Sequence, residues 1–343
     1  MKEVLNVLYV LTQGAVLNLE HDTVRVSVEG ETRLRVPLLR LNGIVLFGQV
    51  SITPFLIQRC ADDGLNLVWL DRAGRFKARV EGQTRGNVLL RRAQHLALSA
   101  PERPWQLARQ FVAAKVQNSR QVLLRAARET TVEEDAATLA LAATGLSAAL
   151  LALPATETLD EVRGAEGEAA RQYFAVFDRM VRVERGAFGL SGRTRRPPRD
   201  RLNSLLSFLY ALLRSECQAA LEGVGLDPQV GYLHALRPGR PALALDLMEE
   251  LRPAFADRLA LALVNRRQLR PQDFEVTPGG AYHLSEQGRR TVVTAYQEYK
   301  AREVPHRVLG EKVPLGLVPH AQARLLARHL RGDLGHYPPF LLR

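Results

Sequence analysis

Residues 105–128 read WQLARQFVAAKVQNSRQVLLRAAR, and this stretch decides the architecture of the larger part of the chain. Its basic residues lie mostly on one side of a helical projection. Its apolar residues recur at helical spacing, at Leu107, Phe111, Val112, Val116, Val122 and Leu123. An apolar stripe with this period predicts one long amphipathic helix. Two prolines in LSAPERPWQ, residues 98–106, precede it, so we expect the architecture to change near residue 98.

The residues before that point follow a period of two. Short alternating or apolar runs are separated by turn sequences; they are TVRVSV (23–28), RLRVPL (33–38), GIVLFG (43–48), LNLVWL (65–70) and RFKARV (75–80). Runs of this kind predict β-strands joined by tight turns. ITPFLIQRCADDG (52–64) predicts one short helix that ends at a glycine. Residues 1–97 are therefore predicted to form a β-rich domain.

Helical patterns continue after the long helix. We expect further helices at about 133–153, 164–183, 201–221, 243–268, 285–302 and 319–331. Residues 98–343 are therefore predicted to form a larger, all-α domain. The predicted fold class is α+β, with a β-rich N-terminal domain followed by this helical C-terminal domain.

The charge balance favours a polyanionic partner. Lys and Arg number 47 against 36 Asp and Glu, which gives a net charge of +11 and a sequence pI near 10.1, and most of the excess is arginine. Guanidinium groups pair with phosphate oxygens in a bidentate way, so nucleic acid is the expected partner. The alternative is a merely basic protein from an arginine-rich coding background.

The sequence predicts a cytoplasmic protein with no membrane span. Cys60 and Cys217 have no CxxC spacing, so neither a disulfide framework nor a cysteine zinc site is expected. The first residues, MKEVLNVLYVLTQG, are typical of a strand rather than of a signal peptide. Residues 136–156 carry no charge and have membrane length, but their Ala, Thr, Gly and Ser content favours a helix packed inside the helical domain.

Two segments carry candidate metal ligands. RGAEGEAARQYF (163–174) predicts a helix start with Glu166 and Glu168 in its first turn, where the helix dipole favours carboxylates. Asp246 and Glu249 are three residues apart and therefore neighbours on a predicted helix, and His234 lies in the loop before it. About four acidic pairs at this spacing arise by chance in such a chain. A helix-capping charge, a solvated acidic pair and a loop histidine therefore remain alternatives to a metal site.

The segment RVERGAFGLSGRTRRPPRDR (182–201) holds seven arginines against two acids. A basic loop of this kind suits contact with a phosphate backbone, and a solvated loop is the alternative. Basic residues also follow one helix at Lys115, Arg120, Arg125 and Arg128, which is weaker evidence because charged outer faces are common.

The combination and order of these segments resembles a known family. The motifs include VPLLRLNGIVLFGQVSIT, RGAEGEAARQYF, GLDPQVGYLH and ALALDLMEELRP. Together they are similar to the CRISPR-associated endonuclease that acts as the spacer-acquisition integrase, the first protein of CRISPR adaptation. The length and motifs look most like the type I-C members.

The resemblance implies a divalent metal, Mn²⁺ or Mg²⁺, held by Glu166, His234 and Glu249, with Asp246 as the adjacent acid. Between the two acids of the pair, Glu249 is favoured as the direct ligand. The predicted DNA-binding residues are Lys115, Arg120, Arg171, Arg193, Arg195, Arg196 and Asn203.

The resemblance also implies an activity and partners. The 3′-OH ends of a prespacer DNA would be joined to the CRISPR repeat by transesterification, and water in place of the hydroxyl would give a nuclease. Expected partners are double-stranded and branched DNA, a second copy of the chain bound through a β-sandwich-like N-terminal domain, and the small second adaptation protein. Alternatives are a non-catalytic DNA-binding scaffold and a repair nuclease for branched DNA.

Overall fold

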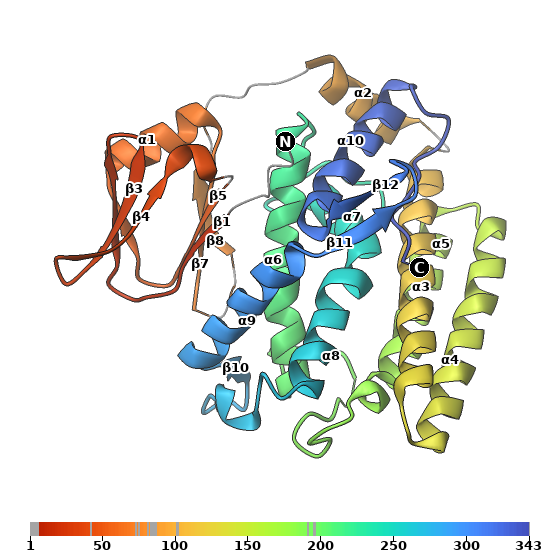
Figure 1. Ribbon diagram of the computed structural model, residues 1–343. Coiled ribbons are helices and arrows are strands. Elements are labelled where there is room, and N and C mark those ends of the chain that lie inside the picture. Colours follow the sequence, from red (N-terminus) through yellow and green to blue (C-terminus); the bar gives the residue numbers. More distant parts are fainter. Residues whose placement is uncertain are drawn as a thin grey trace. The chain divides into compact units, whose positions relative to one another are not determined.

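The computed structural model describes residues 7–342 except positions 42, 73, 75, 81, 83–87, 101, 102, 191, 195 and 196. The chain forms two compact units (Figure 1). The first comprises Met1–Arg85 and Leu284–Gln297, and the second Gly86–His283 and Glu298–Arg343. The boundary predicted at residues 97/98 falls inside helix α2 (Val88–Ser99), which packs on helices of the second unit. The dimerisation role assigned to the first domain stays a prediction.

The first unit contains two four-stranded sheets. Its elements are β1 (Val7–Val10), β2 (Val16–Glu20), β3 (Thr23–Val28), β4 (Glu31–Pro37), a 3₁₀ turn η1 (Leu38–Arg40), β5 (Gly43–Phe47), β6 (Ser51–Ile52), α1 (Pro54–Asp63), β7 (Asn66–Leu70) and β8 (Phe76–Val80). One sheet has the order β1-β5-β7-β8 and the other β4-β3-β2-β6. Strand β5 is buried along its whole length and runs parallel to β1 and β7, which fits its unbroken apolar run.

The core of this unit lies between its sheets and under α1. It joins Leu17 and Val24 of one sheet to Ile44 of the other, and Leu56 of α1 packs on them. Gly64 ends α1 in the left-handed region at φ 68°, as the glycine after the apolar run predicted. The expected β-rich, sandwich-like N-terminal region is thereby confirmed.

The second unit is mainly helical (Figure 1). After α2 its helices are α3 (Arg103–Glu129), α4 (Glu133–Ala152), α5 (Leu159–Ala175), α6 (Arg201–Gly223), α7 (Ala242–Arg252), α8 (Arg258–Asn265) and α10 (Val318–Arg331). Helix α9 (Glu286–Lys300) begins in the first unit and ends in the second. Short 3₁₀ turns are η2 (Leu153–Ala155), η3 (Phe177–Met180), η5 (Pro271–Asp273) and η6 (Leu315–Leu317). The predicted α+β class is confirmed.

The helical region also contains two short hairpins that the sequence did not predict. They pair β9 (Phe274–Val276) with β10 (Tyr282–Leu284), and β11 (Glu303–His306) with β12 (Glu311–Pro314). Strands of three or four residues are too short to produce a period-2 pattern that stands out from chance. The expectation of an all-α second domain was therefore too simple.

Helix α3 is the central element of the second unit. It packs on α2, α4, α5 and α7, and the apolar stripe predicted from the sequence is buried. The polar residues Lys115, Asn118 and Ser119 lie among these apolar positions on the same side of the helix and are buried with them. Of the basic residues predicted for an outer face, Lys115 is therefore buried, Arg120 is half-buried, and Arg125 and Arg128 are exposed.

A buried hydrogen-bond network fastens α7 to α3 and to the C-terminal segment. Asn118 Nδ2 donates to the carbonyl oxygens of Glu250 (2.7 Å) and Phe340 (2.9 Å). The Glu250 carboxyl accepts from Tyr337 Oη (2.5 Å), Gln322 Nε2 (3.1 Å) and the Phe340 N–H (2.9 Å). Burial raises the pKa of Glu250 to about 8. The network fixes the part of α7 that carries the candidate metal ligands.

Helix α4 contains the uncharged segment noted in the sequence. It packs on α3 and α5 through one face, where Leu139, Ala143 and Leu146 are buried, while Leu141 and Leu151 are exposed. Within the described residues, Glu133–Ala155 is the one helical segment long and apolar enough to cross a membrane, and 22% of its apolar 18-residue stretch is buried. Length and hydropathy of this kind also occur in the helices of soluble proteins. The helix thus packs on one side, rather than being enclosed as expected.

Candidate metal centre

Glu166 lies near the middle of α5 and not at its start. Thr158 is the N-cap, and it forms a capping box in which its side chain accepts from the Glu161 N–H and Glu161 accepts from the Thr158 N–H. The prediction that Glu166 sits in the first turn was wrong, because the helix begins at Leu159, about two turns before Glu166. A capping role for Glu166 is therefore excluded.

The His234 loop, between α6 and α7, is tied to α7 by Asp246. One carboxylate oxygen of Asp246 accepts the N–H groups of Tyr232 (2.6 Å) and Leu233 (3.0 Å). The other accepts the His234 N–H (3.0 Å) and lies 2.7 Å from His234 Nδ1. Because a carboxylate only accepts, Nδ1 carries the proton of this hydrogen bond, and Nε2 is the ring nitrogen that faces Glu249. Asp246 thereby sets both the position and the tautomer of the histidine.

Gly231 allows this close approach of loop and helix. A Cβ atom there would lie 2.6 Å from the Ala242 carbonyl carbon and 2.7 Å from an Asp246 oxygen. The loop is also held from outside: Gln94 of α2 donates to the carbonyls of Asp227 and Val230, and Arg163 of α5 donates to that of Leu233. Helices on three sides thus fix the loop that presents His234.

Three of the predicted ligands converge on one place, and we call Glu166, His234 and Glu249 the acidic cluster. The ammonium of Lys115 on α3 contacts Glu166 Oε1 and lies 2.7 Å from Glu249 Oε2. His234 Nε2 lies 3.7 Å from Glu249 Oε1. Residues from α3, α5, α7 and one loop therefore meet at one place, although they are spread over more than 130 positions of the sequence.

The Glu249 carboxylate is buried yet held ionised. Burial acts to raise its pKa, but the positive charges of Arg252 and Lys115, with a smaller effect of His234, outweigh it and lower the pKa to about 2. Arg252 Nη1 lies 3.0 Å from Glu249 Oε1. Although Lys115 Nζ is close to Glu249 Oε2, it is not in a hydrogen-bonding direction, so this buried oxygen has no hydrogen bond.

The donor set suits a hard divalent cation. Two carboxylates and one neutral imidazole nitrogen are ligands that Mn²⁺ and Mg²⁺ accept. The ammonium between the carboxylates marks a position where positive charge is stabilised, and the buried Glu249 oxygen lacks a hydrogen bond there. In the described part of the chain, no three acidic, histidine or cysteine side chains surround one point closely enough to hold an ion without moving. The residues fit a metal once Lys115 withdraws.

The two acids of the pair have different surroundings. Asp246 is fully buried, and both its oxygens are occupied by the His234 loop. Glu249 instead faces Glu166, and one of its oxygens is without a hydrogen bond. Of the two acids, the geometry therefore favours Glu249 as the ligand and makes Asp246 the residue that orients His234.

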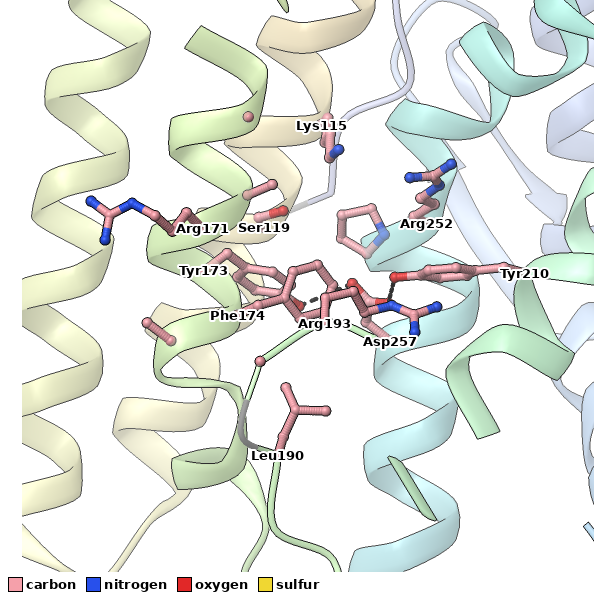
Figure 2. A pocket seen from close by; sticks show the side chains of 15 residues that line it. Lys115, Ser119, Arg171, Tyr173, Phe174, Leu190, Arg193, Tyr210, Arg252 and Asp257 are labelled. Atoms are coloured by element: carbon pink, nitrogen blue, oxygen red, sulfur yellow. Dashed lines mark hydrogen bonds between the residues drawn. The ribbon is translucent and has the colours of Figure 1, made fainter. Parts of the chain in front are cut away.

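A cavity of about 510 Å³ adjoins the acidic cluster (Figure 2). Its walls come from α3, α5, the 182–201 segment, α6 and the α7–α8 junction; the lining includes Lys115, Ser119, Arg171, Tyr173, Phe174, Arg193, Tyr210, Arg252 and Asp257. Lys115 and Arg252 line the cavity and also contact residues of the acidic cluster. Any group bound in the cavity therefore lies next to the candidate ligands.

Asp257 forms the polar floor of this cavity. Its carboxyl accepts hydrogen bonds from Tyr210 Oη (2.7 Å) and Tyr173 Oη (3.1 Å), which Figure 2 shows as dashed lines. Burial raises the pKa of Asp257 to about 6. The guanidinium groups of Arg193 and Arg252 both lie over the Tyr210 ring, 5.2 and 5.1 Å from its centroid. Cationic and aromatic groups thus share one wall.

A π-helix between α7 and α8 places Asp257 there. It spans Pro253–Asp257 and is labelled η4. Proline lacks the N–H that an α-helix needs, which explains why the regular hydrogen bonding is interrupted here. In an α-helix, residues five apart point about 140° away from each other, whereas an i→i+5 turn brings them to one side. Arg252 and Asp257 can therefore both line the cavity.

The predicted DNA-binding residues have varied settings. Arg171 is exposed and forms a bidentate pair with Glu168, and Arg120 is half-buried. Arg193 donates to Asn203, whose fully buried amide also binds Asp200 and so fastens the basic loop. Lys115 is buried against Glu166 and Glu249 instead of lying on an outer face. Arg195 and Arg196 lie outside the described residues.

Sequence reasoning missed Arg252, Tyr210 and Asp257. Arg252 follows Glu249 by three residues, so a search for basic neighbours of the acidic pair could have found it. Asp257 carried no such signal, because its direction depends on the π-helix.

Comparison with known proteins identifies the family. A sequence profile described as "CRISPR associated protein Cas1" matches residues 8–298. The chain belongs to the Cas1 family. It is 55% identical over 343 residues to a CRISPR-associated endonuclease Cas1 of Moorella thermoacetica, with all of both chains covered. A Cas1 endonuclease of Rhodospirillum rubrum is 49% identical, with 99% of each chain covered. The family predicted from the sequence is thus confirmed.

Solved structures share the Cas1 fold. A CAS1 protein from Thermotoga maritima superposes with a TM-score of 0.82 at 24% identity, covering 95% of this chain and 97% of that one. A casposase bound to an integration product gives 0.82 at 23% identity, covering 96% and 92%. A chain of a Cas6-RT-Cas1–Cas2 complex gives 0.83 at 22% identity, with all of this chain and 37% of that one covered. At these identities the likeness establishes the fold alone.

Proposed function

We propose that this Cas1-family chain is a metal-dependent DNA endonuclease and integrase of CRISPR adaptation. The observation that carries the proposal is the acidic cluster: Glu166 and Glu249 converge on one cationic position, beside a histidine whose tautomer is set by Asp246. The high identity to proteins named CRISPR-associated endonuclease Cas1 supports the same activity.

Glu166, His234 and Glu249 would hold Mn²⁺ or Mg²⁺, and the bound ion would supply Lewis-acid activation of a phosphodiester and of the attacking hydroxyl. Asp246 keeps the His234 ring proton on Nδ1, so that the Nε2 lone pair can bind the metal ion. Arg252 balances the charge of Glu249 and stacks on Tyr210, which keeps the buried carboxylate ionised and oriented.

The reaction exchanges one phosphodiester for another. The 3′ oxygen of a DNA end forms a bond to phosphorus in the repeat, the bond from phosphorus to the leaving 3′ oxygen breaks, and that oxygen leaves with the proton. No nucleotide triphosphate is needed. With water as the nucleophile the same site cleaves DNA. Arg193 and Arg252 line the adjoining cavity, where their guanidinium groups can pair with phosphate oxygens.

The proposed partners are double-stranded and branched DNA, the small second adaptation protein, and a second copy of this chain bound through its β-rich region. The net charge of +11 supports DNA as the partner. Relatives of this fold have been solved with an integration product and in a complex named Cas1–Cas2, which supports strand transfer and the protein partner. A cytoplasmic setting is consistent with this role.

The test compares two glutamates of one helix. Glu166→Gln should abolish joining of a labelled duplex to a repeat-bearing plasmid, and cleavage, in the presence of the small partner and Mn²⁺ or Mg²⁺. Glu168→Gln, whose exposed carboxylate pairs with Arg171, should leave both activities unchanged. Salt-sensitive DNA binding should survive in both variants. Strand transfer that persists in Glu166→Gln would reject the assignment and favour a scaffold whose acids are structural.

A further inference from the structure

A second pocket of the helical unit has arginine as the commonest residue in its lining. A cavity of about 140 Å³ lies where the end of α3, the segment after α5, helix α8 and the chain after α9 meet. A neighbouring cavity of about 280 Å³ shares two of its arginines and adds Arg128. We call these two cavities together the arginine pocket. Its seven arginines are Arg125, Arg128, Arg179, Arg182, Arg258, Arg266 and Arg302. Glu129 is the one acid that lines these two cavities.

Carboxylates neutralise only part of this charge. Glu129 pairs with Arg125 and with Arg182, and Asp135 pairs with Arg179. Among the described residues, no ion pair is found for the remaining arginines, which are Arg128, Arg258, Arg266 and Arg302. Like charges placed together without partners repel one another, so the pocket is electrostatically suited to an anion that the chain does not provide.

One of these arginines is held ready for contact. The guanidinium of Arg302 lies 5.1 Å from the centroid of the Tyr299 ring, and Tyr299 Oη in turn donates to the Ala254 carbonyl oxygen at 2.8 Å. Stacking on a fixed ring restricts the arginine before any ligand arrives, which lowers the entropy lost on binding. Arg128, Arg266 and Arg302 are all exposed.

The arginine pocket and the cavity beside the acidic cluster lie along the same elements. Helix α3 contributes Lys115 and Ser119 to the cavity, and then Val122, Ala126 and Glu129 to the arginine pocket. These positions follow the spacing i, i+4, i+7, i+11 and i+14, which is one stripe of a helix. The two sites therefore face the same groove of α3.

The other walls repeat this order. The α7–η4–α8 segment gives Arg252 and Asp257 to the cavity, and then Arg258 and Asn265 to the arginine pocket. Helix α5 lines the cavity, and the η3 turn and residues just after it line the pocket. Along α3, Lys115 is separated from Arg125 and Arg128 by about 15–20 Å at 1.5 Å per residue.

We propose that the arginine pocket binds the phosphate backbone of the same DNA whose reacting phosphate lies at the acidic cluster. The proposal rests on the proposed function and extends it to a part of the substrate remote from the chemistry. In a duplex, 15–20 Å corresponds to about 4–6 base pairs at 3.4 Å each. DNA that reaches the cluster and extends at least this far can contact both places at once. Guanidinium forks match phosphate oxygens and carry no base preference, so the contact positions DNA of any sequence.

The test uses two matched triple variants. Arg128→Gln, Arg266→Gln and Arg302→Gln are combined in one protein. The control combines Arg307→Gln, Arg324→Gln and Arg328→Gln, three exposed arginines outside the pocket. Binding of a labelled duplex of about 20 base pairs is measured without divalent metal over a range of salt concentrations. The pocket variant should bind at least about tenfold more weakly at low salt, and its log–log salt slope should be smaller by about 2–3, because each lost phosphate contact removes about 0.9. The control should match the unsubstituted protein.

A single substitution provides the second readout. Arg266→Gln alone, at an exposed position, should lower the salt slope for the same duplex by about one. Equal losses in both triple variants, or an unchanged salt slope in the pocket variant, would overturn the proposal.

The result is separable from that of the proposed function. Glu166→Gln should stop strand transfer while keeping the full salt slope, and the pocket variant should lose slope while still cleaving DNA at high protein concentration. If Glu166→Gln remains active, the assignment of the metal ligands fails but the measured backbone contact stands. If the pocket variant binds DNA with the same salt slope as the control, while Glu166→Gln stops strand transfer, the arginine-pocket proposal fails and the proposed function stands.

Discussion

Replacing Lys115 by methionine tests whether its ammonium occupies the place of a metal ion. The side chains of Lys115 and Glu249 are 10% and 2% exposed, so the pair is buried, and losing one partner of a buried pair costs about 3–5 kcal/mol. Methionine keeps a similar length and apolar stem. We therefore expect Lys115→Met to lower the free energy of unfolding by about 3 kcal/mol in metal-free buffer.

Divalent metal should then restore much of this loss. An ion between Glu166 and Glu249 replaces the missing charge, and at a concentration of 100 times its Kd it contributes about 2.7 kcal/mol. In the unsubstituted protein the gain should be smaller, because the ion must displace the ammonium first. Urea unfolding with and without Mn²⁺ measures both quantities.

The matched control is Lys300→Met. Lys300 Nζ binds Glu216 Oε1 at 2.6 Å, and the two side chains are 4% and 12% exposed, so a second buried pair is broken away from the acidic cluster. This variant should be destabilised to a similar extent but gain nothing from Mn²⁺. If Mn²⁺ stabilises both lysine variants equally, or neither, the place-holder account of Lys115 is refuted.

Two further predictions concern the surroundings of the site. Gly231→Ala forces a Cβ against the backbone of Ala242 and an Asp246 oxygen, so it should lower the free energy of unfolding by about 1–3 kcal/mol in chemical denaturation. Gly164→Ala, in an open helical position, should instead raise it by up to about 1 kcal/mol. Equal effects of the two substitutions would contradict the packing argument. Asp257 has a pKa of about 6 against an ordinary value of 3.8, so between about pH 4 and pH 6 the folded protein keeps a proton that the unfolded chain has lost. The free energy of unfolding should therefore fall by up to about 3 kcal/mol as the pH rises from about 4 to about 6. Asp257→Asn should lack that decline in unfolding experiments run as a function of pH. The same dependence of the free energy of unfolding on pH in both proteins would refute the assignment.

The period of the apolar residues predicted most of the fold. The α3 stripe from Leu107 to Leu123 and the runs that form β5 and β7 became buried faces, whereas the runs that form β4 and β8 became strands with mostly exposed residues. Helix boundaries were less accurate where capping residues decided them. Helix α5 starts at Leu159, after the capping box of Thr158 and Glu161, five residues before the predicted start.

Side-chain direction inside the helical unit could not be predicted from spacing. Lys115 and Arg120 belong to one helix, yet Lys115 is buried between two carboxylates because α5 and α7 pack across it. Asp246 and Glu249 were equivalent in the sequence pattern, and only the fold of the His234 loop distinguishes them. Local periodicity carries information about which face is apolar, whereas the partner of a buried charge depends on distant segments.

The π-helix Pro253–Asp257 has a consequence for how this protein can change. A helix that contains one surplus residue in a turn can lose that residue without breaking. Deletion of one position there would turn α8 by about 100° and draw it back by about 1.5 Å relative to α7. Glu249 and Arg252 would stay with the reacting cluster, while Asp257 and Arg258 would move together to a new angle. Deletion of a single residue would thus change the angle between Arg258 of the arginine pocket and the acidic cluster, a change that no single side-chain substitution produces.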